Sequence, residues 1–432
     1  MPLWSYAPRL QSLDIQIELG TENCLHSRYF ITSLGLSFKP FYAMYKLRVK
    51  LLAYTNAELA LFSRAKKNLL HLFPQDKVEF VDSNPDIFVF LTGGSESQVV
   101  QSAKPNRFYL VIASPKDNSW AAATEVKAWM NANNISSLLV DQSKPETVQL
   151  VAALYAVRKG LESLKGKRFG LVGEPSDWLI NSVINPDLIN EKLGVEQVTI
   201  PWSEVKPSEQ TSVAADFMSF FKSDSNEGIE MAGKVYEAIA KQVASKQLSA
   251  VTVECFSLVN ACNTTACLGL SKLSLDGIPA GCEGDICSMI GMMLGKEIFG
   301  ITPWMANVAY VNEANILFAH CTIPSNLVSD FTVETHFETD KGAAISGKVK
   351  GNEFTVFRID KELSKIFFGI GIVEKSPYSK NACRTQLTLK FSEMQHRYFT
   401  HNPLGNHHLI VPGNYLLHLE VMARLLGFEI VS

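Results

Sequence analysis

The stretch that decides the fold runs from residue 87 to residue 113 and has the sequence IFVFLTGGSESQVVQSAKPNRFYLVIA. It begins and ends with continuous apolar runs, at residues 87–91 and 108–113, and a segment of helical character lies between them at 97–103. Short uninterrupted apolar runs are typical of strands buried on both faces, which occur in parallel sheets whose faces are covered by helices. The stretch therefore predicts a strand–helix–strand unit of an α/β domain.

The same alternation continues on both sides of this unit. A long helix expected over residues 146–164 ends at Lys165-Gly166-Lys167, which predicts a hinge into a second α/β unit. The other strands expected in the two units lie at 47–54, 78–81, 137–140, 169–172, 196–200 and 250–255. The other expected helices lie at 57–73, 120–132, 178–193, 230–245, 258–273 and 286–294.

The pattern of apolar and polar residues changes after Pro324. Short alternating segments bounded by turn residues predict an antiparallel sheet or a small barrel, and a last helix at 415–426 ends at Gly427. The expected strands lie at 331–336, 343–349, 354–359, 366–372, 385–391 and 409–411. We therefore expect an α/β protein with four parts, namely an N-terminal extension (1–45), two Rossmann-like doubly wound domains (46–165 and 166–322) and a C-terminal antiparallel β-barrel-like domain (323–432).

The composition and charge of the chain argue against several classes of protein. A net charge of −3 gives no electrostatic reason to bind nucleic acid or an anionic membrane surface. The apolar runs are too short to span a bilayer, and the N-terminus lacks the order of a signal peptide. The eight cysteines in so long a chain then indicate reduced thiols rather than a disulfide framework. We expect a cytoplasmic protein with no nucleic-acid or membrane partner.

Two carboxylates stand out in the second unit. Glu283 and Asp285 flank a glycine immediately before an expected helix, and residues 278–294 contain no other charged side chain. Asp285 can serve as the helix N-cap, whereas Glu283 has no such structural explanation and offers oxygen for Mn²⁺ or Mg²⁺ or for proton transfer. Glu254 ends the expected strand at 250–255 and is a further candidate acid at the same sheet edge.

Histidines concentrate late in the chain. His320 ends an apolar strand, His336 lies in an alternating strand, and His407 and His408 follow a Gly-Asn turn. Adjacent strand residues point to opposite faces, so only one member of the His407–His408 pair is expected in any one site. Both members stay candidates for a metal ligand at this point.

In the order of its motifs the chain resembles the L-fucose and L-arabinose isomerase superfamily, and especially its shorter fucose isomerase-related branch. The likeness covers residue 46 to the C-terminus and excludes residues 1–45. It rests on motifs that occur in the family's order: Thr92-Gly93-Gly94, Gly173-Glu174-Pro175-Ser176-Asp177-Trp178, Cys282-Glu283-Gly284-Asp285, His320-Cys321, Cys383-Arg384-Thr385-Gln386 and Gly405-Asn406-His407-His408.

This resemblance implies a sugar isomerase that interconverts an aldose and a ketose through a cis-enediol, with Mn²⁺ or another divalent cation and homo-oligomers that share active sites between subunits. Glu283 is similar in position to the family's acidic ligand and proton carrier. His407 is similar to the ligand histidine of the fucose enzymes, His408 to that of the arabinose enzymes, and His336 to the other histidine of the latter. Glu283, His407 and His408 are thus the implied metal ligands, and Glu283, Asp285 and Glu254 the catalytic candidates. The residues expected to bind the sugar are Asn307, His320, His336 and Arg384.

The chain departs from the family where a second acidic ligand and base is expected. That position holds Asn307, the next frequently acidic one holds Asn312, and the later acid of the arabinose enzymes falls near Ala319. An amide oxygen can bind a cation, but an amide cannot act as a carboxylate base. The alternatives to an isomerase are therefore a catalytically impaired sugar-binding or regulatory homologue, and a small-molecule hydrolase or lyase that uses the same acids.

Overall fold

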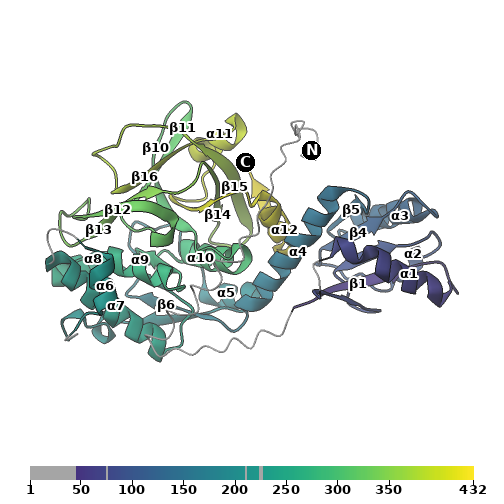
Figure 1. The fold of residues 1–432 in the computed structure, drawn as a ribbon, viewed down its shortest axis with the longest axis horizontal. Helices are drawn as coiled ribbons and strands as arrows, with labels where there is room; N and C mark the ends of the chain where they lie inside the picture. Colours follow the sequence, from purple (N-terminus) through teal and green to yellow (C-terminus); the bar gives the residue numbers. More distant parts are fainter. Residues whose placement is uncertain (1–44, 74–75, 210–211, 223–226) are drawn as a thin grey trace. The chain divides into compact units, whose positions relative to one another are not determined.

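A computed structural model describes residues 45–73, 76–209, 212–222 and 227–432 (Figure 1). The first sheet has five parallel strands in the order β2-β1-β3-β4-β5. Its inner strands β3 (Ile87–Phe90) and β4 (Tyr109–Ala113) are buried along their whole length, as their continuous apolar sequences predict. The other strands are β1 (Leu47–Leu52), β2 (Val78–Phe80) and β5 (Ser137–Asp141).

Helices accompany most of these strands. They are α1 (Leu59–Leu69), α2 (Glu96–Val100), α3 (Ser119–Ala132) and α4 (Pro145–Leu164). The connection from β2 to β3 carries no helix, so the alternation is less regular than the sequence suggests, and the doubly wound classification stays a prediction. The N-terminal extension expected over residues 1–45 lies outside the described residues except for its last residue.

The second sheet has four parallel strands in the order β7-β6-β8-β9. These strands are β6 (Arg168–Val172), β7 (Glu196–Ile200), β8 (Ala250–Val253) and β9 (Ala280–Cys282). The helices of this part are α5 (Pro186–Leu193), α6 (Ala215–Phe220), α7 (Glu227–Ser245), α8 (Cys255–Cys262), α9 (Cys267–Leu275) and α10 (Ile286–Phe299). Two parallel sheets with helices between their strands confirm the α/β class.

Two helices expected in this part are wrong in extent. The expected helix at 178–193 shrinks to α5, because Pro186 holds Asn185 in an extended conformation and the Asn185 side chain caps the helix by accepting from the Asp187 N–H at 2.9 Å. The expected helix at 258–273 is divided into α8 and α9, because Asn263 ends α8 in the left-handed conformation.

Six antiparallel strands close into a barrel, which confirms the expected barrel-like part. The order β14-β17-β10-β11-β16-β15 returns to its start through the pairing of β15 with β14. The strands are β10 (Trp304–Val311), β11 (Asn315–His320), β14 (Glu353–Ile359), β15 (Lys365–Val373), β16 (Thr385–Lys390) and β17 (His407–Pro412). The remaining elements are α11 (Glu393–His401), α12 (Leu416–Leu426) and β18 (Glu429–Val431), which pairs with β15 in parallel.

The barrel differs from expectation in which segments it uses. It takes in β10 and β11, which precede the boundary expected at residue 323. Two segments expected in the same sheet, β12 (Val328–Glu334) and β13 (Ala344–Val349), instead form a separate two-stranded ribbon. The domain boundaries themselves stay predictions.

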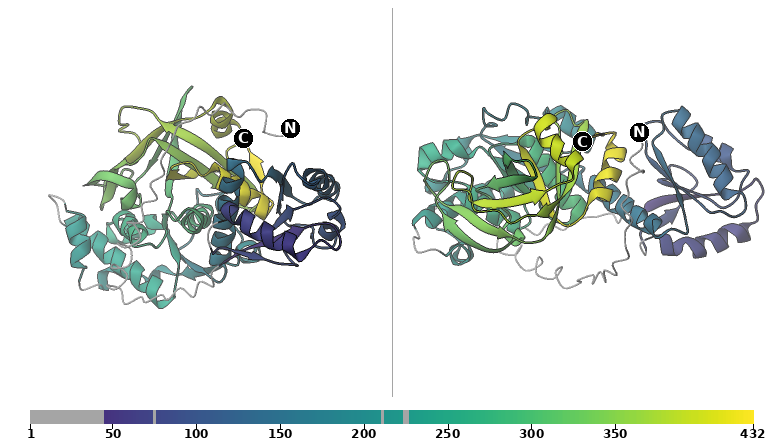
Figure 2. Two further views of the ribbon diagram at one scale, coloured as in Figure 1. Left: turned by 45° about the vertical axis from the view of Figure 1, so that its right-hand side comes forward. Right: turned by 90° about the horizontal axis from the view of Figure 1, so that it is seen from above.

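Helix α10 connects the second sheet to the barrel. It contacts β8 and β9 of the sheet and also β10, β14 and β17 of the barrel. Figure 1 shows α10 between β6 of the sheet and β14 of the barrel, and Figure 2 gives two further views of the fold. Gly291 makes this contact possible, because a Cβ there would lie 2.2 Å from the Leu409 Cδ1 of β17. The strand end that precedes α10 is therefore held close to the barrel. Within the described residues, no helix is long and apolar enough to cross a membrane.

Candidate functional site between the second sheet and the barrel

Glu283 lies in a strained turn at the carboxyl end of β9. Both Glu283 (φ +64°) and Gly284 (φ +68°) have left-handed backbones, which costs a non-glycine residue about 1 kcal/mol or more. A Cβ on Gly284 would lie 2.9 Å from the Cα of Pro175, and the Ser176 N–H donates to the Glu283 carbonyl at 3.0 Å. The segment 173–178, expected to start a helix, thus forms one wall of the turn that carries Glu283.

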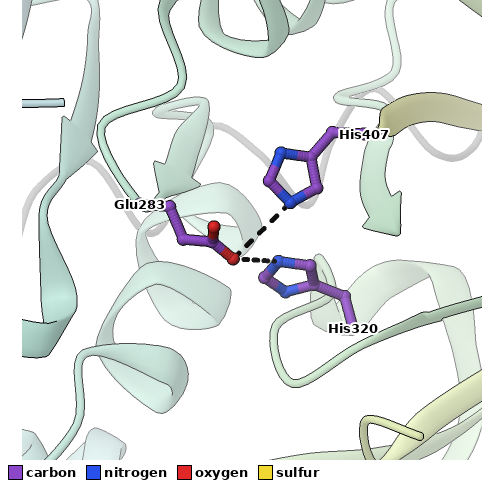
Figure 3. A group of neighbouring side chains, drawn as sticks. All are labelled: Glu283, His320 and His407. Carbon is purple, nitrogen blue, oxygen red and sulfur yellow. Dashed lines mark ion pairs between the residues drawn. The ribbon is translucent and has the colours of Figure 1, made fainter. Parts of the chain in front are cut away.

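Two histidines of the barrel meet this carboxylate. The Oε1 atom of Glu283 is 3.4 Å from Nε2 of His320 and 3.5 Å from Nε2 of His407 (Figure 3). His320 ends β11 and His407 begins β17, and β10 lies between these two strands in the sheet. All three side chains are largely shielded from solvent, with exposed fractions of 13% for Glu283, 4% for His320 and 1% for His407.

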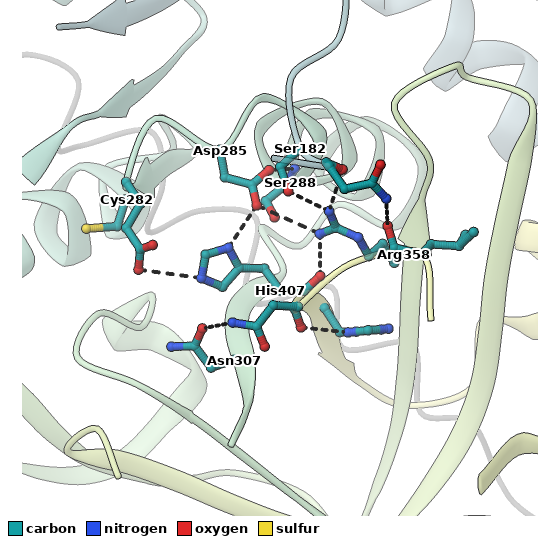
Figure 4. Close-up of polar contacts among 12 residues, drawn as sticks. Ser182, Cys282, Asp285, Ser288, Asn307, Arg358 and His407 are labelled. Atoms are coloured by element: carbon teal, nitrogen blue, oxygen red, sulfur yellow. Dashed lines mark hydrogen bonds and ion pairs between the residues drawn. The ribbon is translucent and has the colours of Figure 1, made fainter. Parts of the chain in front are cut away.

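Asp285 orients His407. Its Oδ2 lies 2.8 Å from Nδ1 of His407, while Oδ1 accepts the Ser288 N–H at 2.7 Å as the N-cap of α10 (Figure 4). Arg358 lies 3.8 Å from the same carboxylate and donates to the His407 carbonyl and the Ser182 hydroxyl. A carboxylate on Nδ1 fixes a proton there, so that in the neutral ring Nε2 is the nitrogen that keeps a lone pair, and it points toward Glu283.

The charges of the cluster shift its pKa values strongly. Burial alone would raise the pKa of Glu283, but the neighbouring imidazoles of His407 and His320 hold it well below its usual range. Burial alone would lower the pKa of His407, but Glu283 and Asp285 raise it to about 9. Without a bound cation, Glu283 and His407 therefore form an ion pair at neutral pH, and Glu283 is a poor proton acceptor.

The cluster has the donor atoms of a transition-metal site. Among the residues that the structure describes, the buried Nε2 atoms of His320 and His407 have no hydrogen-bond partner, and one donor atom from each of the three side chains lies within 4.8 Å of the others. Two imidazole nitrogens and a carboxylate oxygen suit a divalent ion such as Mn²⁺, Fe²⁺ or Zn²⁺. His320 is the less prepared ligand, because its Nδ1 accepts the Thr322 N–H at 3.3 Å and the neutral ring then carries its proton on Nε2.

A row of aromatic rings borders the cluster. The Trp178 indole N–H donates to Oε2 of Glu283 at 2.7 Å, and 54% of Trp178 is exposed. Phe256 meets Trp178 edge-on at 4.9 Å between ring centroids, and His336 meets Phe256 at 5.8 Å. Sequence reasoning gave Trp178 no role beyond opening a helix, since only the folded chain brings this indole to Glu283.

The structure does not bring every expected site residue to this cluster. His408 points away from it and bonds the Tyr398 hydroxyl and the Asn406 carbonyl, each at 3.0 Å, while burial lowers its pKa to about 3. Glu254 caps α8 by accepting from the Ser257 N–H and also accepts from the Trp202 indole at 3.3 Å. The cluster therefore holds two of the three expected metal ligands, together with a histidine that was expected to bind the sugar.

The remaining candidates surround the site or lie farther out. His336 is buried, its Nδ1 is 3.1 Å from the Thr339 hydroxyl, and burial followed by the charge of His320 lowers its pKa to about 4. Asn307 is paired with His407 across β10 and β17, and its amide oxygen accepts from Asn406. Arg384 donates to the backbone of Thr335 at 2.8 Å.

The cysteines near the cluster form no disulfide with any residue that the structure describes. Sγ of Cys255 and Sγ of Cys282 lie 2.8 Å apart without a covalent bond, and the cysteines of the described residues are all free. This state agrees with the expectation of buried core thiols.

Comparison with known proteins gives one distant relationship to report. No family model matches the chain. The chain is 21% identical over 323 residues to a sulfoquinovose isomerase from Alkalicoccus urumqiensis, an alignment that covers 67% of this chain and 71% of that protein. This likeness to a sugar isomerase agrees with the isomerase-like character expected from the motifs, and membership of the fucose and arabinose isomerase superfamily stays a prediction.

Proposed function

We propose that this protein is an aldose–ketose isomerase that uses a divalent cation, with Mn²⁺ the expected ion, held by Glu283, His320 and His407. The observation that carries the proposal is the pair of buried, unpartnered imidazole nitrogens that face one carboxylate oxygen. Unpartnered buried polar atoms are costly, so their convergence on one carboxylate oxygen supports a metal-binding role for the three side chains. The distant likeness to an isomerase supports the choice of reaction.

The reaction moves one proton between two neighbouring carbons of the sugar. A bound divalent cation would supply Lewis-acid polarisation of the sugar carbonyl. Asp285 holds the imidazole of His407 so that Nε2 stays directed at Glu283, and the exposed Trp178 indole offers an apolar face to the C–H groups of a sugar ring. The lowered pKa of Glu283 favours a role as ligand over a role as proton carrier.

A second candidate function is that of a sugar-binding or regulatory homologue without turnover. Asn307 favours it, because this amide replaces the second acid expected from the family and is already bonded to Asn406. In that case the cluster and the aromatic row would serve to bind a sugar only. A homo-oligomer with shared sites stays a prediction under both functions.

The test is turnover of a panel of aldoses and ketoses, including sulfoquinovose and neutral hexoses and pentoses, by the purified protein with added Mn²⁺. NMR would follow the appearance of the isomeric sugar. We expect turnover of at least one sugar, abolished by a chelator and by Glu283→Gln but retained in Glu254→Gln. Turnover that survives Glu283→Gln would contradict the proposed site, while sugar-induced thermal stabilisation without turnover would favour the binding homologue.

A further inference from the structure

The two carboxylate oxygens of Glu283 face different partners. Oε1 lies 3.4 Å from Nε2 of His320 and 3.5 Å from Nε2 of His407. Oε2 instead accepts the indole N–H of Trp178 at 2.7 Å. One oxygen of this carboxylate is thus directed at the two imidazoles (Figure 3), and the other is engaged outside the cluster.

Trp178 is held in place by its own segment and by Phe256. The Ser176 N–H donates to the Glu283 carbonyl at 3.0 Å. The N–H of the buried Leu179 donates to the Ser176 carbonyl at 2.9 Å and closes a turn that contains Trp178. Phe256 packs edge-on against the indole, with 4.9 Å between the ring centroids. The position of the indole N–H is therefore set by the fold itself.

The bond to Oε2 affects how Glu283 can bind a cation. A carboxylate binds a divalent cation through one oxygen or through both, and the hydrogen bond from Trp178 competes with binding through Oε2. An octahedral ion has six positions, and three of them are taken when Glu283, His320 and His407 supply one atom each. The other three stay open to sugar oxygens and water, whereas binding through both oxygens of Glu283 would leave two.

We propose that Trp178 is a positioning residue, whose indole N–H keeps Glu283 a one-oxygen ligand and thereby leaves more of the cation open to the sugar. This inference rests on the proposed function. The ring of Trp178 has a separate role, because 54% of this residue is exposed and its apolar face lies beside the cluster. The N–H acts through Glu283, while the ring contacts the C–H groups of the sugar directly.

The neighbouring strand end offers a matched control. The indole N–H of Trp202 donates to Oε2 of Glu254 at 3.3 Å. Both oxygens of Glu254 also accept from the Ser257 N–H, and this carboxylate is not part of the candidate metal group. The same kind of bond therefore serves a helix cap there, and loss of the Trp202 N–H should leave the cation site unaltered.

Two substitutions separate the N–H of Trp178 from its ring. Trp178→Phe keeps an aromatic ring and loses the N–H, whereas Trp178→Gln loses the ring and keeps an N–H donor at the same number of bonds from Cα. In Trp178→Phe we expect the number of waters on bound Mn²⁺, measured by water-proton relaxation, to fall from about three to about two, because Oε2 is then free to turn to the ion. We expect kcat to fall about 10- to 100-fold, with KM within about threefold and no loss of Mn²⁺ affinity.

Trp178→Gln should show the opposite division. We expect the water number of the unaltered protein and a kcat within about threefold of it, but a KM raised about 3- to 10-fold because the apolar face is lost. Trp202→Phe, which removes the corresponding N–H at Glu254, should change neither the water number, kcat nor KM.

An unchanged water number in Trp178→Phe would overturn the inference, whatever the kcat of this variant. A loss of Mn²⁺ affinity in Trp178→Phe, or an equal change in Trp202→Phe, would also overturn it, since either result would indicate a general structural effect. Mn²⁺ binding without turnover of any sugar would reject the isomerase, and the water numbers alone would then decide the role of Trp178. Absence of Mn²⁺ binding by the unaltered protein would reject both.

Discussion

Two glutamates follow neighbouring strands of the same sheet, and their carboxylates have different roles. Glu254 follows β8 and Glu283 follows β9, each stands before a helix, and each accepts a hydrogen bond from a tryptophan indole, that of Trp202 or Trp178. Glu254 caps its own helix from an ordinary backbone conformation (φ −70°). Before α10 that task belongs to Asp285, and the left-handed turn at Glu283 leaves its carboxylate free to meet two histidines.

An acid that caps a helix is engaged by backbone N–H groups, so the position of the cap determines which acid of the strand end remains available for chemistry. A carboxylate that accepts the first N–H groups of a helix is already stabilised and has a structural reason to be present. Displacing the cap by two residues, at the cost of one strained backbone position, frees the preceding acid. Substitutions at these two acids and at their partners should therefore have different effects on stability and on metal binding.

We expect the largest effect on the pH dependence of stability, because Glu283 forms an ion pair with His407 and Glu254 forms none with the residues that the structure describes. The pKa of His407 is raised from an ordinary value of about 6.5 to about 9 in the folded protein by Glu283 and Asp285, against the effect of burial. The folded state thus binds this proton more tightly than the unfolded state does. The stabilisation is fully present below pH 6.5 and is lost as the pH rises through 9.

Chemical denaturation of the chelated protein between pH 6 and pH 10 would measure this loss, which we expect to reach about 3 kcal/mol. His407→Gln should flatten the dependence, whereas His408→Gln should leave it unchanged because burial lowers the pKa of His408 to about 3 and keeps it neutral throughout. An equal slope in His407→Gln would show that other groups cause it.

The next prediction concerns Mn²⁺ affinity and distinguishes the two roles of Asp285, which caps α10 and orients His407. In Asp285→Asn the remaining carbonyl oxygen can still cap α10 through the Ser288 N–H, but the negative charge beside Nδ1 of His407 is lost. We expect Mn²⁺ affinity to fall about 10- to 100-fold, as it does when the carboxylate that orients a ligand histidine is removed. Calorimetric titration would measure it, and a melting temperature close to that of the unaltered protein would show that the cap survives. Unchanged Mn²⁺ affinity would contradict the orienting role.

The smallest effect tests the cap at Glu254. Glu254→Ala removes the acceptor for the Ser257 N–H and the Trp202 indole, and should lower the free energy of unfolding by about 1 kcal/mol. Mn²⁺ affinity should not change, because this carboxylate is not part of the cluster. A loss of Mn²⁺ binding in this variant would erase the distinction between the two acids.

The sequence predicts the part of this site that is formed by residues close together in the chain. Two acids flank a glycine before an apolar helix, and this pattern identifies Asp285 as a cap and Glu283 as unexplained. The alternation of strand residues likewise limits the site to one member of the His407–His408 pair. The α/β alternation and the antiparallel barrel follow from periodicity in the same way.

The rest depends on which strands become neighbours, and periodicity carries no such information. His320 joins His407 only because β10 lies between β11 and β17 in the closed sheet. Trp178 reaches Glu283 from the irregular segment before α5, and the helix expected to begin at Trp178 starts only at Pro186.

Calorimetric titration of the chelated protein with Mn²⁺ would show whether Glu283, His320 and His407 bind a divalent cation. We expect one ion per chain at pH 8, with affinity at least about 100-fold weaker in Glu283→Gln and unchanged in Glu254→Gln. Binding that is absent in the unaltered protein, or equally strong in Glu283→Gln, would contradict it.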